Sequence, residues 1–272
     1  MVRIVRALSK TGLYDLDYAY NPYIGCFHGC LYCYARAYTR RREVSENWGK
    51  LIYVKENAVE ELMKDVERVG RKGVVGVSTI TDPYQPIESR MKLTRRGIEI
   101  LLSAGFRVSI QTKSPLVLRD LDVFRRYRDK IDVGLTITTL NKELARVLEP
   151  NAPQPVMRAN ALRKLSENKI ETWIFLGPIM KGVNDSSENL ESIIKLAADI
   201  GSKLYYDYFR NKPGLSRSMA RITKKYPMAI TSDRAWRRRV MNLVEKLCER
   251  YGVAYEAAFP PKRERSSLID YI

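Results

Sequence analysis

Short apolar segments alternate with longer amphipathic ones through most of the chain, and this alternation limits the possible folds more than any other feature. The short segments are rich in β-branched residues, which favour strands. We predict strands over residues 18–25, 74–79, 107–112, 131–138, 171–178 and 203–209. We predict helices over 58–69, 94–104, 120–128, 155–167 and 187–200. This order implies parallel strands joined by right-handed helical crossovers.

Six such units predict an α/β fold, a partial (βα)6 TIM-like barrel that is two units short of the closed form. In these folds the chemistry gathers at the C-terminal ends of the strands. We assign residues 1–212 to the barrel with its N-terminal segment, and 213–272 to a C-terminal extension within the same domain. The extension contains a basic helix over 232–251, capped by Ser232 or Asp233, a short strand within 252–259 and a polar tail from Pro260.

Charge and hydropathy narrow the class of protein. The 272 residues include 48 Lys and Arg against 31 Asp and Glu, a net charge of +17, and 45% are hydrophobic, which is enough for a core. The positive excess favours nucleic acid as a partner, although it also serves solubility or thermostability. No apolar run approaches the roughly 20 residues that span a bilayer, and no signal-peptide pattern opens the sequence. We therefore expect a soluble cytoplasmic protein without a membrane partner.

Three of the four cysteines, Cys26, Cys30 and Cys33, are closely spaced, whereas Cys248 stands alone on the apolar face of a helix. A secreted disulfide framework would spread its cysteines along the chain, so the cluster indicates a metal site in a reducing compartment. Three thiolates suit an iron–sulfur cluster with one iron open to another ligand. A zinc site that includes His28, or free thiols that are close by chance, are the alternatives.

The spacing C-x3-C-x2-C, with an aromatic residue before the last cysteine, resembles the signature of the radical S-adenosylmethionine (SAM) superfamily. Further motifs resemble its spore photoproduct lyase-related branch, which is described as DNA repair photolyase-like. They lie at residues 21–26, 81–88, 93–95, 112–114, 119–120 and 148–153. The resemblance covers roughly residues 20 to 210. It implies a partial barrel of six units and a 4Fe-4S cluster on the three cysteines, with SAM at the open iron.

The resemblance also implies where SAM is held. Tyr32 matches the aromatic position beside the adenine, and Arg158 resembles the arginine that pairs with the methionyl carboxylate. Thr79, Thr81 and Asp82 follow the second strand, where the superfamily commonly has Gly-Gly-Glu against the methionyl amino group. Hydroxyl and carboxylate groups suit an ammonium partner, although an ordinary Asp-Pro turn is the alternative.

Later strand ends supply the remaining expected cofactor contacts. A lysine after the third strand suits the cofactor carboxylate or a substrate phosphate, or extends to solvent. Two threonines that end the fourth strand suit the ribose, or pack within the sheet. The loop after the fifth strand would contact adenine and ribose, or serve as a plain connection. These residues are Lys113, Thr136 and Thr138, then Pro178, Ile179 and Asn184.

Tyrosines near the sixth strand are the catalytic candidates. Alternation places Tyr206 and Tyr208 on one face, and Tyr205 and Asp207 on the other. Tyr206 and Tyr208 suit hydrogen-atom relay or base stacking, with packing as the alternative. The characterised photoproduct lyases use an extra cysteine as hydrogen donor, whereas we expect Cys248 to be a buried core thiol. This departure leaves photoproduct repair itself unsupported.

The resemblance implies a reaction. An external donor such as flavodoxin or ferredoxin supplies one electron, and SAM is cleaved to methionine and a deoxyadenosyl radical that abstracts hydrogen from the substrate. The net charge favours a nucleic-acid substrate, in DNA lesion repair or modification, docked on a basic surface that includes Arg234, Arg237, Arg238 and Arg239. The alternatives are a peptide or small-molecule substrate, a zinc-stabilised nucleic-acid-binding protein, or a protein that only transfers electrons.

Overall fold

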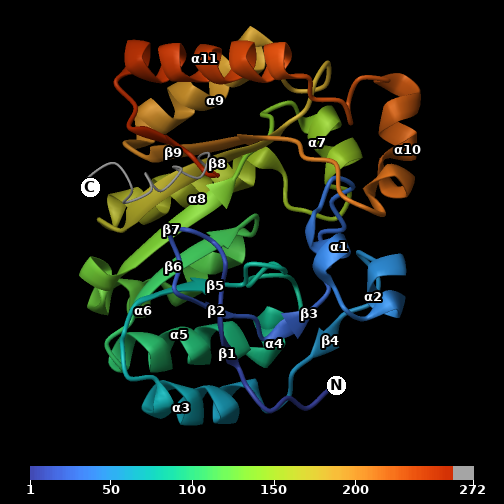
Figure 1. Cartoon of the computed structure of the whole chain (residues 1–272). Coiled ribbons are helices and arrows are strands. Elements are labelled where there is room, and N and C mark those ends of the chain that lie inside the picture. The colour runs from blue at the N-terminus through green and yellow to red at the C-terminus, as the bar shows by residue number, and fades with distance from the viewer. Residues whose placement is uncertain (260–272) are drawn as a thin grey trace, which may run out of the picture.

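The computed structural model describes residues 1–259, and Figure 1 shows one large sheet flanked by helices. The sheet has eight strands in the order β1-β2-β5-β6-β7-β8-β9-β10. Neighbouring strands are parallel, except that β1 is antiparallel to β2. The strands are β1 (Leu8–Lys10), β2 (Tyr18–Tyr20), β5 (Val74–Val77), β6 (Arg107–Thr112), β7 (Ile131–Thr136), β8 (Glu171–Ile179), β9 (Lys203–Tyr208) and β10 (Tyr255–Ala257).

Helices connect the parallel strands and cover one side of the sheet, with α3 and α5 at one end of it and α8 and α9 toward the other in Figure 1. They are α3 (Ala58–Arg68), α5 (Leu93–Ser103), α6 (Leu121–Arg126), α8 (Pro155–Glu167) and α9 (Ser187–Ile200). The six strands β2 and β5 to β9 follow one another in chain order across the sheet. The predicted α/β partial barrel is therefore confirmed.

The structure differs from the sequence prediction where short elements occur. The strand expected over 18–25 is divided, because Pro22 has no N–H to donate to a sheet ladder. Its second part, β3 (Tyr23–Ile24), pairs with β4 (Tyr53–Val54) in a separate small sheet. The helix expected over 120–128 begins with the 3-10 turn η1 (Pro115–Asp120), and a second such turn is η2 (Arg128–Lys130). Helices that we did not predict are α1 (Ala35–Tyr38), α2 (Arg42–Glu46), α4 (Glu88–Met91), α7 (Lys142–Leu148) and α10 (Leu215–Lys225).

The C-terminal helix α11 (Arg234–Tyr251) packs against α9 (Figure 1). It begins at the cap Asp233, whose carboxylate accepts a 2.8 Å hydrogen bond from Trp236 N. Its apolar face, including Trp236, Val240 and Cys248, joins the core of the barrel. We therefore propose that the segment after residue 212 and the barrel form one folding unit. The expected polar tail from Pro260 lies outside the described residues.

Among residues 1–259, the structure contains no helix that is both long enough and apolar enough to cross a membrane.

Candidate active site

A cavity of about 970 Å³ lies inside the partial barrel. At one end its wall contains Cys26, Cys30 and Cys33, and at the other it contains Asp132 and Glu171 from the first residues of β7 and β8. The cysteine loop follows β2, and the loops after β5 and β6 contribute wall residues beside it. The three thiols therefore lie at the C-terminal ends of the strands, where parallel α/β folds hold their ligands.

The cavity cysteines are free thiols that are shielded from water. Cys26 and Cys30 are buried and Cys33 is half-buried. Burial raises the pKa of Cys30 to about 12 and that of Cys26 well above its usual range. Metal binding requires thiolates, so these groups would become charged only when a positive centre binds with them. Three thiols on one cavity wall fit a cluster that takes three protein ligands.

A single-metal site fits this loop less well. Within the part of the chain that the structure describes, no three His, Cys, Asp or Glu side chains converge closely enough to ligate one metal ion. His28 Nε2 instead lies 3.1 Å from Asp82 Oδ2, in an electrostatic contact without hydrogen-bond geometry. A cluster needs no such convergence, because its thiolates bind different irons.

Two side-chain amides hold the cysteine loop at Phe27, between its first two cysteines. Phe27 N donates a 2.9 Å hydrogen bond to Gln85 Oε1, and Phe27 O accepts a 2.9 Å hydrogen bond from Asn151 Nδ2. The loop also crosses a second chain segment closely: a Cβ at Gly29, where φ is +65°, would meet Gly49 Cα at 3.2 Å. The loop is thus fixed from two sides by the motifs at 81–88 and 148–153.

Asp82 is a buried carboxylate beside the same loop. It accepts hydrogen bonds from Thr112 Oγ1 at 2.7 Å, from Lys113 N at 2.9 Å and from Tyr84 N at 2.9 Å. Although burial raises the pKa of Asp82, the nearby His28 and these hydrogen bonds outweigh it and lower the pKa to about 2. Asp82 therefore remains ionised, and it joins the loops after β5 and β6 behind the cysteines.

A second buried carboxylate, Glu149, lies beside the hydroxyl of Tyr32. It accepts hydrogen bonds from the hydroxyls of Tyr32 and Thr138 and forms an ion pair with Arg158. Burial raises the pKa of Glu149, but the charges of Arg158 and Lys113 outweigh burial and lower this pKa below its usual range. Lys113 Nζ lies 5.7 Å from the centroid of the Tyr32 ring. Lys113 is thus a cation on the cavity wall beside this group.

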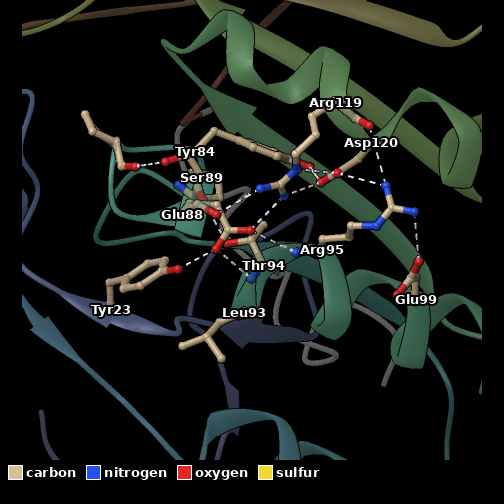
Figure 2. A network of polar contacts seen from close by, with 12 residues as sticks. Tyr23, Tyr84, Glu88, Ser89, Leu93, Thr94, Arg95, Glu99, Arg119 and Asp120 are labelled. Carbon is tan, nitrogen blue, oxygen red and sulfur yellow. Dashed lines mark hydrogen bonds and ion pairs between the residues drawn. The ribbon is translucent and has the colours of Figure 1, made fainter. Parts of the chain in front are cut away.

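The motifs at 81–88, 93–95 and 119–120 converge in the buried network of Figure 2. Arg119 Nη2 contacts Glu88 Oε1 at 2.8 Å, and Arg119 Nε contacts Asp120 Oδ1 at 2.7 Å. Arg95 Nη1 also contacts Asp120, and Thr94 N donates to Glu88. Tyr84 donates its hydroxyl to Asp120 at 2.9 Å. The network therefore fixes the position of residues 81–88. This loop contains Asp82 and Gln85, which lie beside the cysteine loop.

Comparison with known proteins identifies the family. Residues 20–197 match the radical SAM superfamily. The chain belongs to the radical SAM superfamily. It is a radical SAM enzyme, and the family uses a 4Fe-4S cluster and SAM as cofactors. A reductant is required by radical SAM enzymes, as we expected.

Two relatives of this radical SAM protein are described as uncharacterised proteins. One, from Methanocaldococcus jannaschii, is 32% identical and covers 90% of this chain and 92% of that protein. Another, from Acidianus two-tailed virus, is 33% identical over 73% of this chain and 69% of that protein.

Solved structures show the same fold. Spore photoproduct lyase, complexed with a dinucleoside spore photoproduct, aligns with a TM-score of 0.69 at 15% identity, covering 93% of this chain and 78% of that one. SuiB from Streptococcus suis bound to S-adenosylmethionine has a TM-score of 0.62 at 12% identity, covering 89% and 52%.

Most of the expected SAM contacts lie on the cavity wall of this radical SAM enzyme. They are Tyr32, Thr79, Thr81, Asp82, Lys113, Thr136 and Pro178. The others, Thr138, Arg158, Ile179 and Asn184, are not wall residues. Arg158 is turned toward Glu149 and donates to Pro153 O and Thr136 O. Asn184 uses its amide on the backbone, with Oδ1 2.7 Å from Met180 N. Cofactor contacts through these four residues stay predictions that no contact here supports.

The two catalytic candidates in β9 are separated by the sheet. Tyr206 lies on the helix side and donates a 2.5 Å hydrogen bond to Glu245 of α11, so we leave it out of the proposed site. Tyr208, at the end of the strand, lines the cavity, as do Tyr205 and Asp207. The alternation of the strand therefore held for Tyr205, Tyr206 and Asp207, whereas Tyr208 faces the cavity near a register shift between β8 and β9.

Several wall residues were missed by the sequence reasoning. Ser109 and Gln111 of β6 point into the cavity, and so do Trp173 and Phe175 of β8. A period of two counted back from Lys113 would have found Ser109 and Gln111. Trp48, which lies beside the cysteines, follows no strand and carried no comparable signal.

Proposed function

We propose that this radical SAM enzyme abstracts a hydrogen atom from a nucleic acid, in lesion repair or nucleic-acid modification. A strongly basic segment beside the cavity carries the proposal. Between residues 211 and 241 the single acidic residue is Asp233. The basic residues of this segment are Lys212, Arg217, Arg221, Lys224, Lys225, Arg234, Arg237, Arg238 and Arg239. None of these basic residues forms an ion pair with an acid among residues 1–259, so their charge is available to phosphates.

The basic segment adjoins the cysteine loop. On α10, Ser218 donates a 2.6 Å hydrogen bond to Leu31 O, and Met219 packs in one apolar cluster with Cys30 and Tyr32. The opposite face of α10 exposes its Arg and Lys side chains. A phosphate backbone that lies on α10 would therefore pass close to the cluster end of the cavity.

Arg237 connects α11 to the cavity wall. Its Nη1 donates to the Tyr208 hydroxyl at 3.0 Å, and its guanidinium carbon lies 5.2 Å from the Tyr208 ring centroid. Arg210 lies against the same ring at 4.3 Å. The expected four-arginine surface is thereby revised, because Arg237 holds Tyr208, whereas Arg234, Arg238 and Arg239 are exposed.

The aromatic side chains of the cavity wall suit a nucleobase of the substrate. Trp173 and Tyr205 form an edge-to-face pair with ring centroids 5.2 Å apart, and both line the wall, as do Phe175 and Tyr208. Aromatic side chains stack on bases of any sequence, at about 1–3 kcal/mol per base. We propose that these rings orient a base while Lys212 holds a flanking phosphate; Arg210 is instead paired with Asp207 at 3.0 Å.

We further propose that Cys26, Cys30 and Cys33 hold the cluster and that SAM lies against the wall residues around Tyr32 and Lys113. When bound, the cluster supplies the electron that cleaves SAM and so gives the deoxyadenosyl radical. Lys113, a cation among buried groups, would face the methionyl carboxylate. The barrel wall would exclude water and fix the distance between radical and substrate.

Binding and product assays test the substrate class. We expect fluorescent DNA and RNA oligonucleotides to bind, with an affinity that falls steeply with salt, by a log–log slope of about 0.9 per phosphate contact on duplex DNA. Replacing Arg234, Arg238 and Arg239 with Gln should weaken binding and flatten that slope. The matched control replaces three exposed arginines outside this segment, Arg68, Arg128 and Arg163, which should change binding less.

Two results would contradict the proposal. A wild-type protein that binds neither DNA nor RNA would exclude a nucleic-acid substrate. An equal loss of affinity in the two triple variants would show that only net charge matters, and would exclude this segment as the docking surface. A screen of the reduced enzyme with DNA, RNA, peptides and small-molecule extract, read by mass spectrometry, then separates a nucleic-acid product from the peptide or small-molecule alternative.

A further inference from the structure

Two buried N–H donors beside the cysteine loop have no acceptor within residues 1–259. Trp48 is 6% exposed, and its indole Nε1 has no hydrogen-bond partner. The Nε of Arg36 is also buried without a partner. The two side chains are neighbours, since the guanidinium carbon of Arg36 lies 5.8 Å from the centroid of the Trp48 ring. An unpaired buried donor costs about 1–3 kcal/mol, so a pair of them indicates an acceptor that the chain itself does not supply.

The surroundings of these donors identify the acceptor. Trp48 belongs to one apolar cluster with Cys26, against which Cys33 also packs, and it lines the cavity together with both cysteines. Arg36 follows Cys33 by three residues and forms no ion pair among the described residues. Burial lowers the pKa of Arg36, and Cys33 and Cys30 act in the opposite direction. A partly desolvated cation and an indole N–H therefore stand beside thiols that would be charged in the loaded protein.

Two buried carboxylates near the loop already have partners, whereas the ring nitrogens of His28 have no hydrogen-bond partner among residues 1–259. Asp82 accepts hydrogen bonds from Thr112 and from the backbone. Glu149 accepts a hydrogen bond from Tyr32 and forms an ion pair with Arg158. The other cavity tryptophan, Trp173, donates its Nε1 to Asp132 at 2.8 Å. Of the two cavity tryptophans, Trp48 thus has a free donor and lies on the cysteine side.

We infer that Trp48 donates a hydrogen bond, and Arg36 presents its charge, to sulfur atoms of the bound 4Fe-4S cluster, and that both raise its reduction potential. The inference rests on the cluster site proposed at Cys26, Cys30 and Cys33 and is independent of the substrate. A cluster on three thiolates is anionic and gains negative charge on reduction. A cation and an N–H donor therefore stabilise the reduced form more than the oxidised form.

The test compares midpoint potentials of reconstituted variants without SAM, after iron and sulfide are measured. Trp48→Phe keeps the ring and removes the donor, and Arg36→Met removes the charge. Each should shift the potential to more negative values, with a change of up to about tenfold in the ratio of reduced to oxidised cluster, or 59 mV for one electron. Arg42→Met is the control, because its exposed side chain pairs with Glu46 on the surface of α2. Its potential should equal that of the wild type.

Unchanged potentials in both test variants would overturn the inference. An unchanged potential with weaker SAM binding would also overturn it, by assigning the donor to SAM. Should Trp48→Phe lose its cluster, wild-type protein with ¹⁵N in its indole rings decides the matter by pulsed electron paramagnetic resonance. We expect a ¹⁵N coupling to the reduced cluster that persists in Trp173→Phe, and its absence would refute the hydrogen bond. A wild-type protein that binds no iron or sulfide would instead refute the cluster site itself.

Discussion

Replacing Arg119 with Met tests whether the network of Figure 2 stabilises the loop behind the cysteines. Arg119 donates to Glu88 Oε1 at 2.8 Å, to Glu88 O at 2.8 Å and to Asp120 Oδ1 at 2.7 Å. Glu88 and Asp120 are fully buried. Met fills similar space but donates no hydrogen bond, so the two carboxylates would lose their shared cation.

The size of the effect follows from burial. Removing one partner of a buried ion pair costs about 3–5 kcal/mol. Arg119 is 21% exposed, and Arg95 and Thr94 still contact the two carboxylates. We therefore expect a loss near the lower end, about 3 kcal/mol. At roughly 2–4 °C per kcal/mol for a chain of this size, Tm should fall by about 6–12 °C.

Thermal unfolding followed by circular dichroism measures this change. Arg163→Met is the control, because its 3.8 Å contact with Asp199 is exposed on both sides and such pairs contribute about 0–1 kcal/mol. The Arg119 variant should also release iron to a chelator faster, since Gln85 of the anchored loop holds Phe27. If the two variants have the same Tm, the network does not stabilise the loop in the way that the contacts indicate.

Three further predictions concern the site. Cys26→Ala, Cys30→Ala and Cys33→Ala should each abolish cluster assembly in anaerobic iron and sulfide analysis, whereas Cys248→Ala, which changes a core thiol, should not; full cluster content in any of the first three would exclude that ligand. Asn151→Ala removes the hydrogen bond to Phe27 O, so a chelator should remove iron faster than from the wild type, and equal rates would show that this contact is dispensable. Asp82 has a pKa of about 2 against an ordinary 3.8, so it stabilises the fold above about pH 4 and this contribution is lost as the pH falls to 2. At neutral pH the metal-free Asp82→Asn variant should have an unfolding free energy about 2 kcal/mol below that of the wild type. This difference should shrink as the pH falls from about 4 to 2, and a constant difference would contradict the shifted pKa.

The elements with strong local signals were predictable from the sequence. The helix at Ser187–Ile200 has the cap Ser186 and the left-handed Gly201 at its ends, and both bounds were predicted as observed. The strand Arg107–Thr112 was also predicted with its observed bounds. In contrast, α10 was missed although Leu215, Met219 and Ile222 have the i, i+4, i+7 spacing of an amphipathic helix; only the fold shows that this face packs with the cysteine loop.

The site was predictable as a set of strand ends but not as a set of contacts. The cysteine spacing and the alternation of β6 depend on neighbours in the sequence. The pairing of Arg158 with Glu149 depends on how α8 and its preceding loop pack, so an arginine expected at the cofactor is turned to a carboxylate. The hydrogen bond from Asn151 to Phe27 O joins residues that are 124 positions apart, and only the fold brings them together.

The formation of deoxyadenosine tests most directly whether the cysteine loop supports radical SAM chemistry. Anaerobically reconstituted protein, with its iron and sulfide verified, would be reduced with dithionite and incubated with SAM. We predict slow release of deoxyadenosine and methionine from the wild type, and none from Cys30→Ala treated in the same way. A cluster-loaded wild-type sample that yields no deoxyadenosine would contradict this prediction.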